Sequence, residues 1–106
     1  IKYNAHDGRA AERYADIARM LGLPGNSNKG LIENLCALID KMNDELNIPH
    51  TLKEFGVDEA EFNAKVDEIA VNAVGDACTG SNPRAIDPAT MAKLFKCTYY
   101  GTEVDF

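Results

Sequence analysis

Apolar residues recur along this 106-residue chain at the three- and four-residue spacing that is typical of amphipathic helices. The strongest repeat predicts a helix from about Asn28 to Leu46, with an apolar face broad enough to contact more than one neighbour. The residues of this face are Leu31, Ile32, Leu35, Leu38, Ile39, Met42 and Leu46. An earlier repeat predicts a first helix that ends at Gly22. The residues of its face are Ala11, Tyr14, Ala15, Ala18 and Leu21.

Capping residues mark the start of three further helices. Thr51 and Glu54 form a capping box, in which each side chain accepts a hydrogen bond from a backbone N–H, and Gly56 ends this short helix. Asp58 caps a fourth helix, and Asp87 caps a fifth. The residues predicted to face inward on the fourth helix are Phe62, Val66, Ile69, Ala70 and Ala73. Those predicted to face inward on the fifth helix are Met91, Leu94, Phe95 and Thr98. No segment alternates as a strand does, so the sequence predicts an all-α fold with five helices.

The charge balance excludes two classes of partner. The chain has 17 acidic and 11 basic residues, which gives a net charge of -6, and the basic residues are scattered singly. Such a surface repels phosphate backbones, so we expect neither nucleic-acid binding nor docking on an anionic membrane. No stretch approaches the about 18–20 apolar residues of a membrane-spanning helix.

The residues that bind metals are few and far apart. The three cysteines, Cys36, Cys78 and Cys97, form no Cys-x-x-Cys pair, so we expect no zinc site, no redox dithiol and no disulfide framework. Free cysteines fit a reducing cytoplasm. His6 and His50 are the only histidines and are well separated. A complete iron or zinc site within these 106 residues is therefore not expected.

An irregular loop that begins near Cys78 interrupts the helical pattern. A thiolate nucleophile needs a base or a positive partner, and no histidine lies nearby, although Arg84 is close in the sequence. The hydroxyl groups of the loop precede a helix N-terminus, where an anion could bind, but Asp87 already occupies that cap. We therefore favour a structural interpretation, in which the side chains of Thr79, Asn82 and Arg84 hold the turn.

Three linked segments resemble the C-terminal end of iron-dependent (group III) alcohol dehydrogenases. They are residues 3–5 with 13–18, residues 47–57, and residues 76–84 closed by residues 99–101. The motif Cys-Thr-Gly-x-Asn-Pro-Arg in the third segment is fairly specific. In the second segment Asn47, which stands where the family has glycine, and Phe55 depart from the family pattern. The long second helix most resembles that of the alcohol dehydrogenase half of bifunctional aldehyde-alcohol dehydrogenases.

The resemblance implies a larger parent protein. In this family an α/β domain binds NAD(H), and a helical domain holds a metal, usually iron (Fe2+), through one Asp and three His. Residues 1–106 would form a single helical subdomain, the five-helix C-terminal portion of that metal-binding domain. His6 and His50 match no ligand position, so we expect the fragment itself to bind neither iron nor NAD and to be inactive alone. A chain that opens at Ile1 rather than Met fits a fragment.

The resemblance also implies an activity. We expect the parent to be a cytoplasmic NAD-linked enzyme that interconverts short aliphatic aldehydes, such as acetaldehyde, and their alcohols. Its partners would be the rest of the parent chain and further copies in a homo-oligomer. Cys78 matches a cysteine that approaches the substrate cavity, which makes it a candidate pocket residue, while Thr79, Asn82 and Arg84 would hold its loop. The alternative is a non-catalytic, acidic helical module that binds a protein through an apolar helix face.

Overall fold

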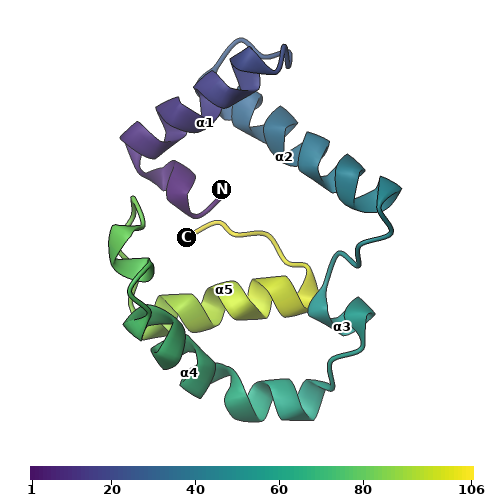
Figure 1. Ribbon diagram of the computed structural model, residues 1–106, viewed down its shortest axis with the longest axis vertical. Coiled ribbons are helices and arrows are strands. Elements are labelled where there is room, and N and C mark those ends of the chain that lie inside the picture. The colour runs from purple at the N-terminus through teal and green to yellow at the C-terminus, as the bar shows by residue number, and fades with distance from the viewer. The chain divides into compact units, whose positions relative to one another are not determined.

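The computed structural model describes all 106 residues and contains five α-helices, two short 3-10 helices and no strand (Figure 1). The elements in chain order are η1 (Asn4–His6), α1 (Gly8–Met20), α2 (Asn28–Glu45), α3 (Leu52–Phe55), α4 (Glu59–Gly75), η2 (Thr79–Ser81) and α5 (Pro88–Tyr100). The predicted all-α fold with five helices is confirmed. No helix combines the length and apolar character that a membrane crossing requires.

The helices group into two compact units, within a region for which the sequence predicted a single subdomain. The first unit consists of Ile1–Ile48 with Asp105–Phe106, and the second of Pro49–Val104. The first unit therefore contains η1, α1 and α2, and the second contains α3, α4, η2 and α5.

The core of the first unit lies where α1 meets α2. Ala15 and Ala18 of α1 are fully buried against Leu31 and Leu35 of α2. Alanine has a small side chain, which lets two helix backbones approach closely. The helices diverge from the linker that joins them, so the far end of α2 has no helical neighbour within this unit (Figure 1). This divergence explains why three apolar residues predicted to face inward on α2 are exposed: Ile39, Met42 and Leu46.

The first helix also departs from its predicted face. Leu21 was expected inward but is 55% exposed, because it lies at the C-cap, beyond the last helical residue. Ala10, which the sequence pattern missed, is buried instead. Asp7 accepts a hydrogen bond from the backbone N–H of Ala10 at 2.9 Å and so caps the start of α1.

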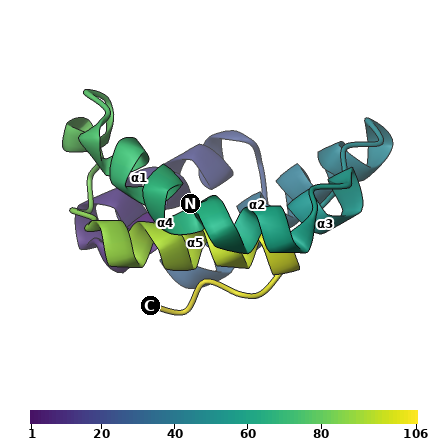
Figure 2. The same cartoon turned by 90° about the horizontal axis from the view of Figure 1, so that it is seen from below.

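The core of the second unit lies between α4 and α5, which run side by side (Figures 1 and 2). Its buried residues are Phe62, Val66, Ala70, Ala92 and Tyr99. The rings of Phe62 and Tyr99 stack with centroids 4.3 Å apart, at an interplanar angle of 20°. Stacked aromatic rings add to the free energy gained from burial alone. These two rings therefore connect the start of α4 to the end of α5.

Two residues of the second unit do not face the core as predicted. Thr98 is exposed, and its hydroxyl donates to the carbonyl of Leu94 at 3.0 Å. Its neighbour Tyr99 is buried in its place, because Ala92, partly buried Phe95 and Tyr99 recur at the three- and four-residue spacing of one helix face. Ile69 is 42% exposed, at the edge of the α4 face rather than in the core.

The predicted caps are confirmed. The side chains of Thr51, Asp58 and Asp87 accept hydrogen bonds from the backbone N–H groups of the residues three positions later, at 3.0, 2.9 and 2.7 Å. In the capping box, however, the Glu54 carboxylate accepts from the N–H of His50 at 2.9 Å, one residue before the predicted donor. Each cap depends on residues within one turn, which explains why the sequence alone locates it.

Candidate functional site

The loop after α4 presents the Cys78 side chain to solvent. The backbone N–H of Cys78 donates to Asp76 Oδ1 at 2.8 Å. Its carbonyl accepts from Ser81 Oγ at 2.8 Å and from the backbone N–H of Ser81 at 3.2 Å. Local hydrogen bonds therefore fix the backbone around Cys78 while the side chain stays exposed.

Two of the three other predicted loop residues make short hydrogen bonds to the backbone. Thr79 Oγ1 donates to the carbonyl of Ala73 at 2.6 Å, which ties η2 to the last turn of α4. Asn82 Nδ2 donates to the carbonyl of Arg84 at 2.6 Å, which closes the turn that follows. Arg84 itself is half-buried. The structure thus brings Cys78 and the other three residues into one loop.

The charge at the next helix N-terminus disfavours an anion at this loop. Asp87 caps α5, and the hydrogen bonds that its carboxylate accepts from the backbone N–H and the hydroxyl of Thr90 lower the pKa of Asp87. The carboxylate is therefore ionised across the neutral range. A phosphate or carboxylate ligand at the start of α5 would meet this negative charge at close range.

The other two cysteines lie outside the loop. Cys36 is half-buried on α2, and burial raises the pKa of its thiol, an effect that the nearby Lys2 ammonium opposes. Cys36 is therefore protonated at neutral pH and a poor nucleophile. Cys97 is also half-buried, and its Sγ donates to the carbonyl of Glu103 with a separation of 3.6 Å.

The residues of this chain do not fit a metal centre. His6 belongs to the first unit and His50 to the second. No group of three or more His, Cys, Asp and Glu side chains is arranged to hold a metal ion. Catalytic metals in proteins need about three protein ligands around one ion, so this chain alone does not supply such a set.

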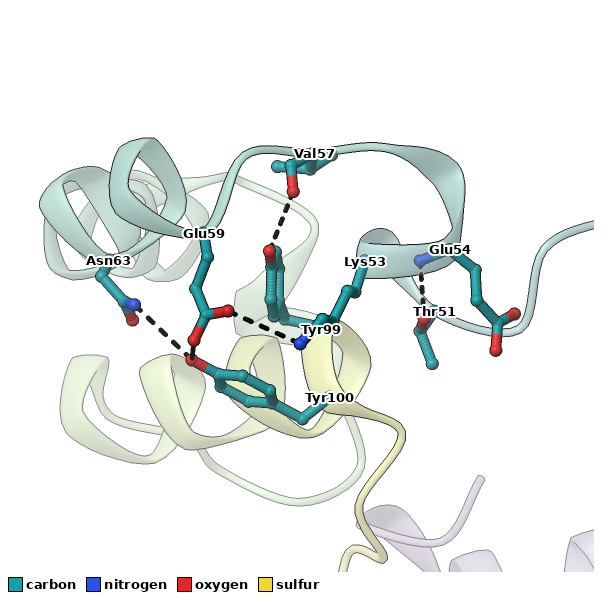
Figure 3. Close-up of polar contacts among 8 residues, drawn as sticks. All are labelled: Thr51, Lys53, Glu54, Val57, Glu59, Asn63, Tyr99 and Tyr100. Carbon is teal, nitrogen blue, oxygen red and sulfur yellow. Dashed lines mark hydrogen bonds and ion pairs between the residues drawn. The ribbon is translucent and has the colours of Figure 1, made fainter.

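A second polar cluster, which the sequence pattern did not single out, joins the end of α5 to the region around α3 and α4 (Figure 3). Tyr100 donates its hydroxyl hydrogen to Glu59 Oε1 at 3.0 Å and accepts from Asn63 Nδ2 at 3.5 Å. Lys53 Nζ lies 3.6 Å from the other oxygen of Glu59. The cluster joins side chains up to 47 residues apart, which a search for local patterns does not detect.

Tyr99, beside this cluster, is buried and hydrogen-bonded. Its hydroxyl donates to the carbonyl of Val57 at 2.8 Å, as Figure 3 shows. Burial raises the pKa of Tyr99, and the Glu59 carboxylate adds to this shift. The hydroxyl is therefore a neutral hydrogen-bond donor at physiological pH. The cluster and Tyr99 hold helices together and present no nucleophile or metal ligand set.

Comparison with known proteins agrees, along almost the whole chain, with the family that the sequence resembles. Residues 1–99 match the family described as "Fe-containing alcohol dehydrogenase family, C-terminal". The chain is 51% identical over 106 residues to the NADPH-dependent butanol dehydrogenase of Clostridium saccharobutylicum. That alignment covers 100% of this chain and 27% of the relative.

Two further relatives have different names within the same class of enzyme. The bifunctional aldehyde-alcohol dehydrogenase AdhE of Escherichia coli strain K12 is 38% identical over 118 residues, 97% of this chain and 13% of the relative. The NAD-dependent methanol dehydrogenase of Bacillus methanolicus is 33% identical over 87 residues, 80% of this chain and 22% of the relative. This chain thus spans about a quarter or less of the length of these relatives. The helical fold and the match over residues 1–99 together show that the chain belongs to the Fe-containing alcohol dehydrogenase family, as its C-terminal part.

Proposed function

We propose that this chain is the C-terminal helical segment of an enzyme that interconverts short aliphatic aldehydes and alcohols with a nicotinamide cofactor. The family match over residues 1–99 carries the proposal. The names of the relatives support the substrate class, because they specify butanol, methanol and aldehyde-alcohol dehydrogenases. We favour NAD as the cofactor and the cytoplasm as the location, although the name of the butanol dehydrogenase specifies NADPH.

The segment contributes packing rather than chemistry in this proposal. The family description implies iron, but no side-chain cluster of this chain fits a metal. The metal and the nicotinamide would be held by other parts of the polypeptide. The exposed apolar end of α2, which includes Ile39, Met42 and Leu46, would be covered by those parts.

Cys78 is the residue of this segment that we place beside the substrate. Its side chain is exposed on a loop whose backbone is fixed by short hydrogen bonds, which is the arrangement required of a side chain that shapes a pocket. Thr79, Asn82 and Arg84 would act on the substrate only through the position of this loop. The hydrogen bonds of Thr79 and Asn82 to main-chain carbonyls support this role.

The activity is tested on the polypeptide that contains this segment, purified with iron. We expect alcohol-dependent reduction of NAD and aldehyde-dependent oxidation of NADH, followed at the absorbance of NADH. Absence of both reactions with a series of short linear alcohols and aldehydes would contradict the proposed activity.

The pocket role of Cys78 has its own test. Replacing Cys78 by Ala, and separately by Val, should change the ratio of kcat/KM between short and longer aldehydes, because the residue would touch the substrate chain. Cys97→Ala is the matched control, since Cys97 lies on α5 away from this loop, and it should leave the ratio unchanged. An unchanged ratio in both Cys78 variants would contradict the pocket role and leave the activity itself unaffected.

A further inference from the structure

The residues that follow α5 contribute to both compact units. Residues 102–106 form neither helix nor strand. Asp105–Phe106 belong to the first unit, whereas the residues before them, Pro49–Val104, belong to the second. The chain therefore returns, after α5, to the unit that contains η1 and α1.

Burial alternates along these last residues. Val104 and Phe106 are half-buried, whereas Glu103 and Asp105 are exposed. In an extended chain every second side chain points to the same side, so one side of this segment faces the protein and the other faces water. The carbonyl of Glu103 also accepts a hydrogen bond from Cys97 Sγ at 3.6 Å. The segment therefore lies along the surface instead of projecting into solvent.

Within the first unit, Phe106 packs on Tyr3. The centroids of the two rings lie 6.3 Å apart at an interplanar angle of 57°, which is a favourable arrangement for a tilted aromatic pair. Tyr3 is 8% exposed, although neither of the two hydrophobic cores includes it. A residue 103 positions later in the chain therefore supplies part of the cover of Tyr3.

Tyr3 lies at the start of the turn that leads into α1. Its carbonyl accepts a hydrogen bond from the backbone N–H of His6 at 3.4 Å, and the N–H of Asp7 donates to the carbonyl of Asn4 at 3.0 Å. These bonds belong to η1, a single 3-10 turn, in which hydrogen-bond geometry is poorer than in an α-helix. A turn this short is marginal in water without tertiary packing, so its order depends on neighbours such as Phe106.

We propose that residues 102–106 act as a strap, which closes when Phe106 packs on Tyr3 and then holds the turn before α1 in place. When the strap opens, Tyr3 is exposed and the hydrogen bonds of η1 are free to break. The strap has no helical hydrogen bonds of its own, so it opens by local unfolding while the helices stay folded. This role does not depend on the proposed enzymatic activity.

Hydrogen exchange followed by mass spectrometry tests the strap in the full polypeptide that contains this segment. Phe106→Ala removes the ring that covers Tyr3, and we expect it to speed exchange of the backbone amides in residues 1–7 by roughly twofold to tenfold. Phe106→Tyr keeps the ring and should leave this exchange close to its original rate. Tyr3→Ala removes the other ring and should speed exchange in residues 102–106. The measurement requires no turnover, so it gives a result whether or not the enzymatic activity is found.

Phe55→Ala is the matched control. It removes the same side chain from α3, where Phe55 is 72% exposed, and should leave exchange in residues 1–7 unchanged. The amides of α4 and α5 serve as an internal reference, because the strap is proposed to open without them. The proposal is overturned if Phe106→Ala leaves exchange in residues 1–7 unchanged, or if Phe106→Tyr speeds it as much as Phe106→Ala does. It is also overturned if Phe106→Ala speeds exchange equally in α4 and α5, since the whole chain would then be destabilised.

Discussion

Removal of the Tyr99 hydroxyl should destabilise the second unit. Tyr99 is 1% exposed, and its hydroxyl donates to the carbonyl of Val57 at 2.8 Å. Tyr99→Phe keeps the ring that stacks on Phe62 but leaves this carbonyl without that donor. Losing the hydrogen bond to this half-buried carbonyl should cost about 1–2 kcal/mol of folding free energy.

The adjacent tyrosine provides the matched control. Tyr100 is 41% exposed, and its hydroxyl bonds only to the exposed side chains of Glu59 and Asn63. Water replaces those partners in Tyr100→Phe, so we expect a loss of about 0.5 kcal/mol or less. The same atom is removed from neighbouring residues that differ in burial and in hydrogen-bond partner.

Urea unfolding followed by circular dichroism measures the two free energies of unfolding. Hydrogen exchange of the α4 and α5 amides supplies a second measurement that is specific to this unit, because it does not require the whole chain to unfold in one transition. Tyr99→Phe should lower protection across both helices, and Tyr100→Phe should leave it almost unchanged. An equal or larger effect of Tyr100→Phe would refute the argument from burial.

Four further predictions concern particular residues. Gly101→Ala should destabilise the chain by about 1 kcal/mol or more, because Gly101 has φ +71 and the added Cβ would lie 2.9 Å from a methyl group at the start of α3. Gly75→Ala, a helical position with open space around it, should be neutral or stabilising in the same unfolding assay. Maleimide labelling of the folded chain, analysed by mass spectrometry, compares the reactivity of two cysteines. Exposed Cys78 should react faster than Cys36, because the Cys36 thiol is half-buried and has a raised pKa. Equal rates of labelling would contradict this prediction. Folding raises the pKa of Tyr99, so the neutral side chain stabilises the folded state. This stabilisation is complete at pH values below the pKa of tyrosine in the unfolded chain. It is lost as the pH rises through the pKa of Tyr99 in the folded chain. Tyr99→Phe should therefore reduce the alkaline loss of stability in pH-dependent unfolding.

Local signals in the sequence located the helices well. The caps at Thr51, Asp58 and Asp87 involve a side chain and a backbone N–H three residues later, so nothing distant is needed to form them. Gly56 and Gly101 end their helices with φ +99 and φ +71, a conformation that glycine adopts without strain. These contacts are complete within one or two turns, and the order of residues specifies them.

Asn47 adopts a backbone conformation that is more usual for glycine. It is the one non-glycine residue with a positive φ, at 54°. Asparagine tolerates the left-handed conformation better than most residues. Asn47 therefore allows the chain to turn just after the end of α2 without a glycine.

The buried faces of the helices were predicted less well, because tertiary neighbours decide them. Ile39 and Met42 continue the apolar repeat of α2, yet they are exposed because α1 diverges from that end of the helix. The contact of Tyr99 with Val57 links residues 42 positions apart, and no local pattern indicates it. For the loop, the sequence identified the residues around Cys78, whereas their hydrogen-bond partners required the structure.

The most direct test of the central claim is to graft this chain into a relative. Residues 1–99 would replace the matching segment of the Clostridium saccharobutylicum butanol dehydrogenase, to which the chain is 51% identical. The same enzyme with that segment deleted is the inactive control. If the chain is the C-terminal part of this enzyme family, the graft should oxidise NADPH with butyraldehyde at a rate well above that of the deletion. A graft that folds but is as inactive as the deletion would contradict the account.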